Sequence, residues 1–379
     1  MAASRKPNFL IVLIDDLRFD ELGICGHPYM KTPNIDRIGH EGTMFTAAFH
    51  TTPLCSPNRA SILTGQYASR HGIIDNVARD AHSHRLPNYH VVLQKLGYET
   101  AHVGKWHMGN SGGPRPGYDH WVSFPGHGSI VNPVLNIDGD ERQHKGYITD
   151  LLNEHAVDFL KKKRSKPFAL FFAHKAVHPD AYQAPDGQVS FKNGGYLPAP
   201  RHADLYKGEH FPRRPNALPH ADVVKQKPAW TEAFQLRVNE ASRALLDGMK
   251  AGTEEEIRLR AAMMASVDEG MGDVFKVLEE TGQLDNTFIL FLATMAISSA
   301  STGSAPSAAS PTRKASCRRS WSAIRHGSSR ARSTTTSCWR STSRRPLSSS
   351  PAANPVNTSR AVRCFHSSGE TGRVGASRF

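Results

Sequence analysis

The sequence contains little cysteine and no apolar run of the roughly 20 residues that a membrane helix needs. Of five cysteines, only Cys25 and Cys55 precede residue 293, which excludes a disulfide framework over most of the chain. The apolar run at residues 9–14 is too short for the hydrophobic region of a signal peptide and ends in two aspartates. These absences predict a soluble, cytoplasmic protein with no membrane partner.

Acidic residues are almost missing from the last quarter of the chain. Residues 293–379 contain fourteen Lys or Arg and one acid, Glu370, so this segment carries all of the net charge of +13. The remaining residues contain 33 basic and 33 acidic side chains (47 − 14 and 34 − 1). Because their charges balance, the sequence before residue 293 gives no electrostatic reason to expect a nucleic-acid or other polyanionic partner.

Strand and helix patterns alternate from residue 8 to residue 292. Continuous apolar runs at 8–14, 100–103, 168–172 and 288–292 are typical of strands buried on both faces of a parallel sheet. Helices are predicted from Pro33, from Arg59 to Tyr67, at 149–163, and from a capping box at Thr253 and Glu256 to about residue 280. Residues 181–230 are rich in Pro, His, Lys and Gly and predict long loops over a site. The alternation predicts an α/β sandwich with a mostly parallel sheet.

Four short motifs carry the functional signal. Cys55-Ser-Pro-Asn-Arg59 has the spacing Cys-x-Pro-x-Arg, and Leu63-Thr-Gly65 follows it. Asp15-Asp16 ends the first strand, and Gly104-Lys-Trp-His-Met-Gly109 and Ala173-His-Lys-Ala-Val-His178 follow later strands. Together these motifs resemble the type I sulfatases of the alkaline-phosphatase-like superfamily. The resemblance covers residues 7–292 and implies an alkaline-phosphatase-like sandwich.

The resemblance implies a modified nucleophile. Cys55 would be oxidised to formylglycine by a formylglycine-generating enzyme, and the hydrated aldehyde would attack sulfur and ligate a metal ion. Arg59 would anchor this group. A lone cysteine is otherwise more often an ordinary buried side chain.

The resemblance also assigns the metal ligands. From position alone, Asp15 and Asp16 could equally form a solvated turn or a helix cap. In the family, the matching aspartates bind Ca²⁺, with Mg²⁺ as the alternative, and the hard carboxylate oxygens suit both ions.

Three further positions match groups that act on the sulfate ester. Lys105 would contact the sulfate, and His107 would hydrogen-bond the hydrated aldehyde and serve as general base. His178 would donate a proton to the leaving alcohol, and His174 is expected to be a structural histidine with its hydrogen bonds satisfied. The other histidines, among them His71, His82, His84 and His127, are expected on the surface or in substrate loops.

The composition changes abruptly after Leu292. The sequence of residues 293–379 is Ser/Arg-rich and of low complexity, typical of a disordered basic tail. A sharper hypothesis is a shifted reading frame, because degenerate third bases allow Ala293, Thr294 and Met295 to become Gly-Asp-Asn, followed by Gly-Tyr. In the family, that Asp-Asn pair supplies the remaining calcium ligands. We predict a catalytic domain at 1–292 and an out-of-frame, disordered segment at 293–379.

These features predict hydrolysis of an aryl or carbohydrate sulfate ester by a formylglycine enzyme. Because two expected metal ligands are replaced by Thr294 and Met295, we expect the chain as written to have little activity. The alternatives are a phosphonate monoester or phosphodiester hydrolase of the same superfamily, an inactive frameshifted remnant, and a protein with a nucleic-acid-binding tail.

Overall fold

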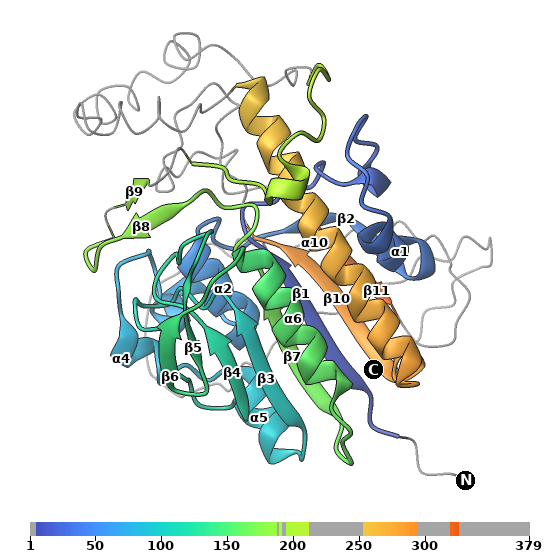
Figure 1. Ribbon diagram of the computed structural model, residues 1–379. Coiled ribbons are helices and arrows are strands. Elements are labelled where there is room, and N and C mark those ends of the chain that lie inside the picture. Colours follow the sequence, from blue (N-terminus) through green and yellow to red (C-terminus); the bar gives the residue numbers. More distant parts are fainter. Residues whose placement is uncertain (1–4, 188, 192–194, 212–252, 295–318, 326–379) are drawn as a thin grey trace, which may run out of the picture.

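The protein is built on a nine-stranded sheet (Figure 1). The computed structural model describes residues 5–187, 189–191, 195–211, 253–294 and 319–325. In spatial order the strands are β2 (Thr43–Phe49), β11 (Arg319–Arg325), β10 (Thr287–Ala293), β1 (Asn8–Ile14), β7 (Phe168–Ala173), β3 (Glu99–Gly104), β4 (His120–Ser123), β5 (Val134–Ile137) and β6 (Asp140–Gln143).

The central part of this sheet is parallel. Strands β10, β1, β7, β3 and β4 run in one direction, and antiparallel strands continue the sheet on both sides. The register aligns Ile14 with Ala293 and Leu13 with Ala173, so the central strands end at a common edge. The prediction of a mostly parallel sheet is confirmed. In sheets of this kind, ligands bind beyond the carboxyl ends of the strands.

Helices cover both faces of the sheet (Figure 1). One face carries α1 (Pro33–Glu41), α6 (Ile148–Lys161) and α10 (Glu254–Glu280), and the other carries α2 (Cys55–Thr64) and α5 (Tyr89–Lys95). Shorter elements are η1 (Gly23–Cys25), α3 (Ala68–His71), α4 (Asp80–Ser83), η2 (Pro200–His202) and η3 (Leu284–Asn286). No helix among the described residues is long and apolar enough to cross a membrane.

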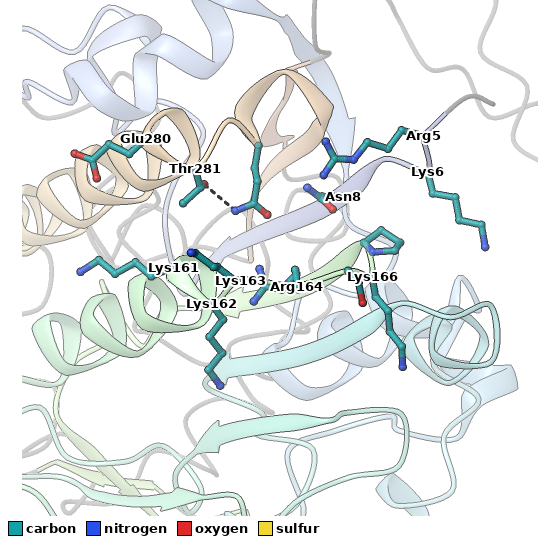
Figure 2. Close-up of a pocket in the computed structure, with 13 residues that line it drawn as sticks. Arg5, Lys6, Asn8, Lys161, Lys162, Lys163, Arg164, Lys166, Glu280 and Thr281 are labelled. Carbon is teal, nitrogen blue, oxygen red and sulfur yellow. Dashed lines mark hydrogen bonds between the residues drawn. The ribbon is translucent and has the colours of Figure 1, made fainter. Parts of the chain in front are cut away.

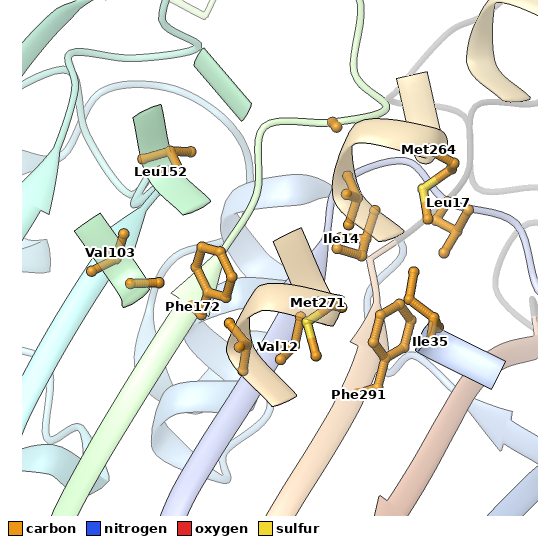
Figure 3. Close-up of a cluster of buried hydrophobic side chains, with 14 of the residues drawn as sticks. Val12, Ile14, Leu17, Ile35, Val103, Leu152, Phe172, Met264, Met271 and Phe291 are labelled. Carbon is orange, nitrogen blue, oxygen red and sulfur yellow. The ribbon is translucent and has the colours of Figure 1, made fainter. Parts of the chain in front are cut away.

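The alternation of side chains along β1 builds two hydrophobic cores. Leu10, Val12 and Ile14 point toward α6 and α10, in the cluster drawn in Figure 3, while Ile11 and Leu13 join the core beneath α2 and α5. Because both faces are buried, the strand reads as a continuous apolar run instead of an alternating one.

The predicted helix starts agree with the local capping chemistry. Thr253 precedes α10, and its hydroxyl accepts a hydrogen bond from the Glu256 amide at 3.1 Å. Pro33 lies at the start of α1, where its missing N–H has no helical partner to lose. The helix predicted from Arg59 to Tyr67 is α2, which begins earlier, at Cys55.

Two segments differ from their sequence-based description. The predicted loop region 181–230 contains a two-stranded sheet of β8 (Ala181–Gln183) and β9 (Val189–Phe191), and Tyr196, Ala199 and Phe211 are buried in the core. Residues 212–252 of that region lie outside the described residues. Within the predicted tail, residues 319–325 form β11, because the backbone edges of β10 and β2 offer hydrogen-bonding groups that need no apolar periodicity.

Candidate active site

The carboxyl ends of three central strands gather a buried ion cluster around Asp15. This residue directly follows β1, and both of its oxygens face cations. The Lys105 ammonium contacts one oxygen, and Arg59 Nη2 lies 3.3 Å from the other. None of these three side chains is exposed. Burial opposes ionisation of Asp15, but the charges of Lys105 and Arg59 outweigh it and hold the pKa of Asp15 well below its usual value.

The backbone positions both cations. Lys105 follows β3, and its carbonyl accepts a hydrogen bond from Arg59 Nη1 at 2.6 Å. Gly104, one residue earlier, has a φ of 121°, and a Cβ there would lie 1.9 Å from the Ala173 carbonyl oxygen. A glycine is therefore required where β3 and β7 meet, and the motif Gly-Lys-Trp-His depends on this close approach.

Cys55 lies at the first residue of α2 and faces the same cluster. Ligand atoms of Asp15, Cys55 and His178 all lie within 4.8 Å of one another, and all three residues are buried. Burial, with the negative charge of Asp15 adding to it, raises the pKa of the Cys55 thiol far above its usual range. The unmodified side chain is therefore a protonated thiol, which is a poor nucleophile and a poor ligand.

Three histidine rings lie against one another beside Lys105. The ring centroids of His107 and His127 are 4.1 Å apart, and those of His127 and His178 are 4.3 Å apart. Lys105 Nζ donates a hydrogen bond to His127 Nδ1 at 3.0 Å. Burial is the main cause that holds the pKa of all three rings well below the usual histidine value, and Lys105 adds to it. All three rings are therefore neutral near pH 7.

Hydrogen-bond partners fix the tautomers of two of these rings. His107 Nε2 meets the Gln183 side-chain oxygen and must donate to it, so Nδ1, which has no partner among the described residues, keeps the lone pair. His178 Nδ1 lies 2.9 Å from the Pro179 carbonyl oxygen, so its lone pair is on Nε2. That atom lies 3.8 Å from Asp16 Oδ2.

Asp16 is held differently from its neighbour. Its backbone has a φ of 57°, its amide donates to the Thr294 hydroxyl at 2.9 Å, and its carbonyl accepts from Arg260 at 2.6 Å. Burial and the charge of Asp15 raise the pKa of the Asp16 carboxyl to about 7. Its Oδ2 is buried and has no hydrogen-bond partner among the described residues. An orphaned, buried carboxylate oxygen is an expected position for a cation.

The donor set fits a hard divalent ion. Asp16 Oδ2 accepts no hydrogen bond from the described residues, and ligand atoms of Asp15, Cys55 and His178 lie within 4.8 Å of one another. In the metal-free protein, Lys105 and Arg59 neutralise the negative charge of Asp15. A bound ion would share this role with them. Asp15, Asp16 and the residue at position 55 are therefore the residues that would hold the ion.

The structure brings the predicted residues together in one place. Asp15, Asp16, Cys55, Arg59, Lys105, His107 and His178 all belong to this cluster. Thr294, expected from the sequence to stand where a metal ligand should be, contacts both Asp15 and Asp16. No sequence feature indicated Gln183 or Arg260, and His127 was expected on the surface or in a substrate loop. No local pattern marks these three residues, because each reaches the cluster only through the folded sheet and its loops.

Three histidines differ from their predicted environments. His127 and His71 were expected near the surface, but both are buried, and His71 bonds the Ser61 hydroxyl at 3.0 Å. His174 is buried as expected, yet neither ring nitrogen has a partner among the described residues, and its ring lies against Phe172. Loop burial cannot be read from residue spacing, so these environments come from the tertiary structure alone.

Comparisons with known proteins agree with this arrangement. The family model described as Sulfatase matches residues 7–293. The N-acetylglucosamine-6-O-sulfatase of Bacteroides thetaiotaomicron is 27% identical over 342 residues, covering 76% of this chain and 58% of the relative. The N-acetylgalactosamine-6-sulfatase of Canis lupus familiaris is 30% identical over 55% of this chain and 46% of its own length. The chain thus spans about half the length of these curated relatives.

Solved structures share the fold. A structure in complex with its substrate D-glucosamine-2-N,6-O-disulfate has a TM-score of 0.66 at 23% identity and covers 88% of this chain and 74% of its own. The phosphonate monoester hydrolase of Agrobacterium radiobacter has a TM-score of 0.62 at 20% identity, covering 88% of this chain and 71% of its own. At these identities the likeness concerns the fold.

Proposed function

Because the chain belongs to the sulfatase family of the alkaline-phosphatase-like superfamily, we propose that it hydrolyses sulfate esters carried by a saccharide, such as a 6-sulfated amino sugar. The observation that carries this proposal is the placement of Cys55 at the start of α2, within 4.8 Å of donor atoms of Asp15 and His178. The two curated relatives are named for 6-sulfated amino sugars, which favours that substrate class over a simple aryl sulfate.

Cys55 is the residue that requires modification. Its buried thiol stays protonated, so it cannot attack sulfur efficiently as it stands. Oxidation to formylglycine by a formylglycine-generating enzyme would replace the thiol with a hydrated aldehyde, whose oxygen is a competent nucleophile.

A Ca²⁺ ion is the proposed metal, with Asp15, Asp16 and modified residue 55 as its ligands, and Mg²⁺ as the alternative. When bound, such an ion supplies positive charge that stabilises negative charge on the sulfate oxygens. Lys105 and Arg59 add two fixed cations to the same place. Their burial makes this charge effective, because little water is present to screen it.

The histidines divide the proton transfers. His107 is neutral and its Nδ1 lone pair is free, so it suits the general base that takes a proton from the hydrated aldehyde. Gln183 keeps this tautomer in place through its bond to Nε2. His178 is the proposed donor to the leaving alcohol, but its Nε2 must first take up a proton, because Nδ1 already donates to Pro179.

We also propose that the segment after Leu292 is read in a shifted frame. The Thr294 hydroxyl donates to Asp15 at 2.8 Å and accepts from the Asp16 amide, at the position where the other frame encodes an aspartate. A metal ligand at this position would contact the same two aspartates. Met295 lies outside the described residues. Sequencing the coding DNA of residues 284–304 tests this proposal, because third bases that do not permit Gly-Asp-Asn-Gly would contradict it.

The activity is tested with the full chain co-expressed with a formylglycine-generating enzyme. We expect slow sulfate release from N-acetylglucosamine 6-sulfate, because Thr294 replaces an expected metal ligand in the chain as written, and a mass change at residue 55 in the tryptic peptide. Cys55→Ala should lower kcat/KM by about a thousandfold or more, because it removes the nucleophile. Cys25→Ala is the matched control and should leave turnover unchanged, since this half-buried thiol lies in η1. Faster turnover of a phosphonate monoester than of the sulfate would favour the alternative hydrolase.

A further inference from the structure

A second concave site lies at the opposite edge of the sheet. The pocket has a volume of about 550 Å³ and lies at the amino ends of β1 and β7 and the carboxyl ends of α6 and α10 (Figure 2). Because β1 contains 7 residues, its length places this pocket roughly 23 Å from Asp15 at the other edge. The pocket therefore does not belong to the candidate active site.

Its lining is strongly basic. Seven of the thirteen lining residues are Lys or Arg and one is acidic, Glu280. The basic residues come from two segments distant in sequence: Arg5 and Lys6 before β1, and the run from Lys161 to Lys166 after α6. Residues 5–292 are nearly neutral as a whole. Folding thus concentrates positive charge in this pocket, although the net charge of these residues gives no sign of it.

Three lysines of this pocket have no counter-charge from the described residues. Lys161, Lys162 and Lys163 are exposed, and none of them has an acidic partner within ion-pair distance among the described residues. Lys161 ends α6 and so also favours the negative end of the helix dipole. That interaction explains one lysine of the run, but it gives no reason for the others or for Arg5 to line the same pocket.

Arg164 supplies a second, independent observation. Its side chain is only 6% exposed, its Nε bonds Glu99 at 2.9 Å, and its guanidinium lies 4.4 Å from the Phe159 ring centre. Its Nη1 is buried and has no hydrogen-bond partner among the described residues. Figure 2 shows this side chain between Lys163 and Lys166 among the lining residues. Arg164 therefore adds a guanidinium of fixed position to the lining of the basic pocket.

We propose that this pocket is a non-catalytic site for a sulfated polysaccharide. Its volume lies within the range of saccharide-sized and drug-sized ligands, so it is larger than a lone sulfate requires. The Ser165 hydroxyl lines it beside the cations and suits a sugar hydroxyl, whereas the Gln283 amide donates to the Thr281 hydroxyl at 2.7 Å. The choice of a sulfated saccharide rests on the proposed function, and the presence of an anion site does not.

Single-stranded nucleic acid is a competing polyanion, and the lining disfavours it. Proteins that bind single strands stack bases on aromatic side chains, and none of the thirteen lining residues is aromatic. A site that grips a sulfated polymer away from the reaction centre would hold substrate near the enzyme and raise its effective concentration. The catalytic steps themselves would be unchanged.

The test compares two full-length variants that lose the same charge. The pocket variant carries Lys161→Gln, Lys162→Gln and Lys163→Gln, and the control carries Lys31→Gln, Lys145→Gln and Lys207→Gln at exposed positions outside the pocket. The basic segment 293–379 is present in both, so its contribution cancels. Calorimetric titration with a size-defined heparin oligosaccharide should show about tenfold weaker binding for the pocket variant and less than about twofold for the control.

Salt dependence gives a second measurement. The slope of log affinity against log salt should fall by about two to three for the pocket variant, because three ionic contacts are lost. Equal weakening in the two variants would overturn the proposal, since binding would then follow overall charge. A DNA duplex of similar charge that binds as tightly and loses the same factor would overturn the saccharide assignment.

Sulfate release from N-acetylglucosamine 6-sulfate, measured on the same variants, separates this site from the proposed function. The pocket variant should turn over this small substrate at the rate of the unsubstituted chain. A protein that binds heparin through these lysines but releases no sulfate would uphold the pocket and contradict the sulfatase activity. If the protein releases sulfate but the two variants bind heparin equally, the sulfatase activity would be upheld and the pocket proposal contradicted.

Discussion

The two edges of the central sheet use positive charge in opposite ways. At the carboxyl edge, Lys105 and Arg59 are fully buried and paired with Asp15. At the amino edge, Lys161, Lys162 and Lys163 are exposed and have no acidic partner in the part of the chain that the structure describes. A buried, paired cation is fixed in position and poorly screened, whereas an exposed one is adaptable and sensitive to salt.

This difference separates what each edge can do. The carboxyl edge can hold charged groups at defined positions, as catalysis requires, because every cation there is tied to a carboxylate or a backbone carbonyl. The amino edge can attract an anionic polymer without fixing one geometry. The two edges should therefore respond very differently when a charge is removed.

Asp15→Asn should have the largest effect on stability. Removing the carboxylate leaves Lys105 and Arg59 buried without their shared counter-charge, which should lower the free energy of unfolding by about 3–5 kcal/mol. Urea unfolding of the metal-free protein measures the change. Asp140→Asn breaks an exposed pair with Arg142 and should cost at most about 1 kcal/mol. Equal losses in the two variants would contradict the contrast between buried and exposed pairs.

Glu21→Gln should give a smaller loss that depends on pH. Burial alone would raise the pKa of Glu21, but Arg260 and Arg18 lower it below its usual value. The ionised pair with Arg260 therefore stabilises the fold fully above the unfolded pKa of about 4.3 and less as pH falls through the folded pKa. We expect a loss of about 3 kcal/mol near pH 7 that shrinks at about pH 3.5. A loss independent of pH would indicate a packing effect instead.

Thr294→Asp should make stability depend on calcium. A carboxylate beside Asp15 and Asp16 adds repulsion in the metal-free protein and should cost about 1–3 kcal/mol. Ca²⁺ at about a hundred times its Kd should return about 2.7 kcal/mol. Thermal unfolding with Ca²⁺ and with a chelator measures both changes. Thr294→Ser keeps the hydroxyl and serves as the control, and an identical calcium response in the two variants would remove position 294 from the metal site.

The triple variant of Lys161, Lys162 and Lys163 should have the smallest effect on stability. These exposed side chains form no ion pair among the described residues, so their replacement by Gln should change the free energy of unfolding by about 0.5 kcal/mol or less. The same variant should still lose most of its heparin affinity. A large loss of stability would mean that the amino edge is a structural element instead of a docking site.

Much of the fold follows from local patterns. The run Asn8–Ile14 reads as a strand because it is apolar on both sides, and Thr253 marks the start of α10 because its hydroxyl caps the helix. Strand β11 did not follow from its sequence, because its place depends on the open edges of β10 and β2. Asp15, Lys105 and His174 lie directly after recognisable strands, whereas Cys55 and Arg59 were found through the spacing Cys-x-Pro-x-Arg and its resemblance to a known family.

By itself, the sequence determined the family, the mostly parallel sheet and the residues that its motifs carry, from Asp15 to His178. Only the tertiary structure decided which other side chains complete the two charged sites. Gln183 fixes the His107 tautomer, and Arg5 joins the lysines after α6, although neither lies near its partners in the chain. The physical reason is that hydrogen bonds and electrostatic interactions depend on the distance between groups in space. Folding sets these distances by bringing distant segments together in one sheet, and a linear pattern does not contain them.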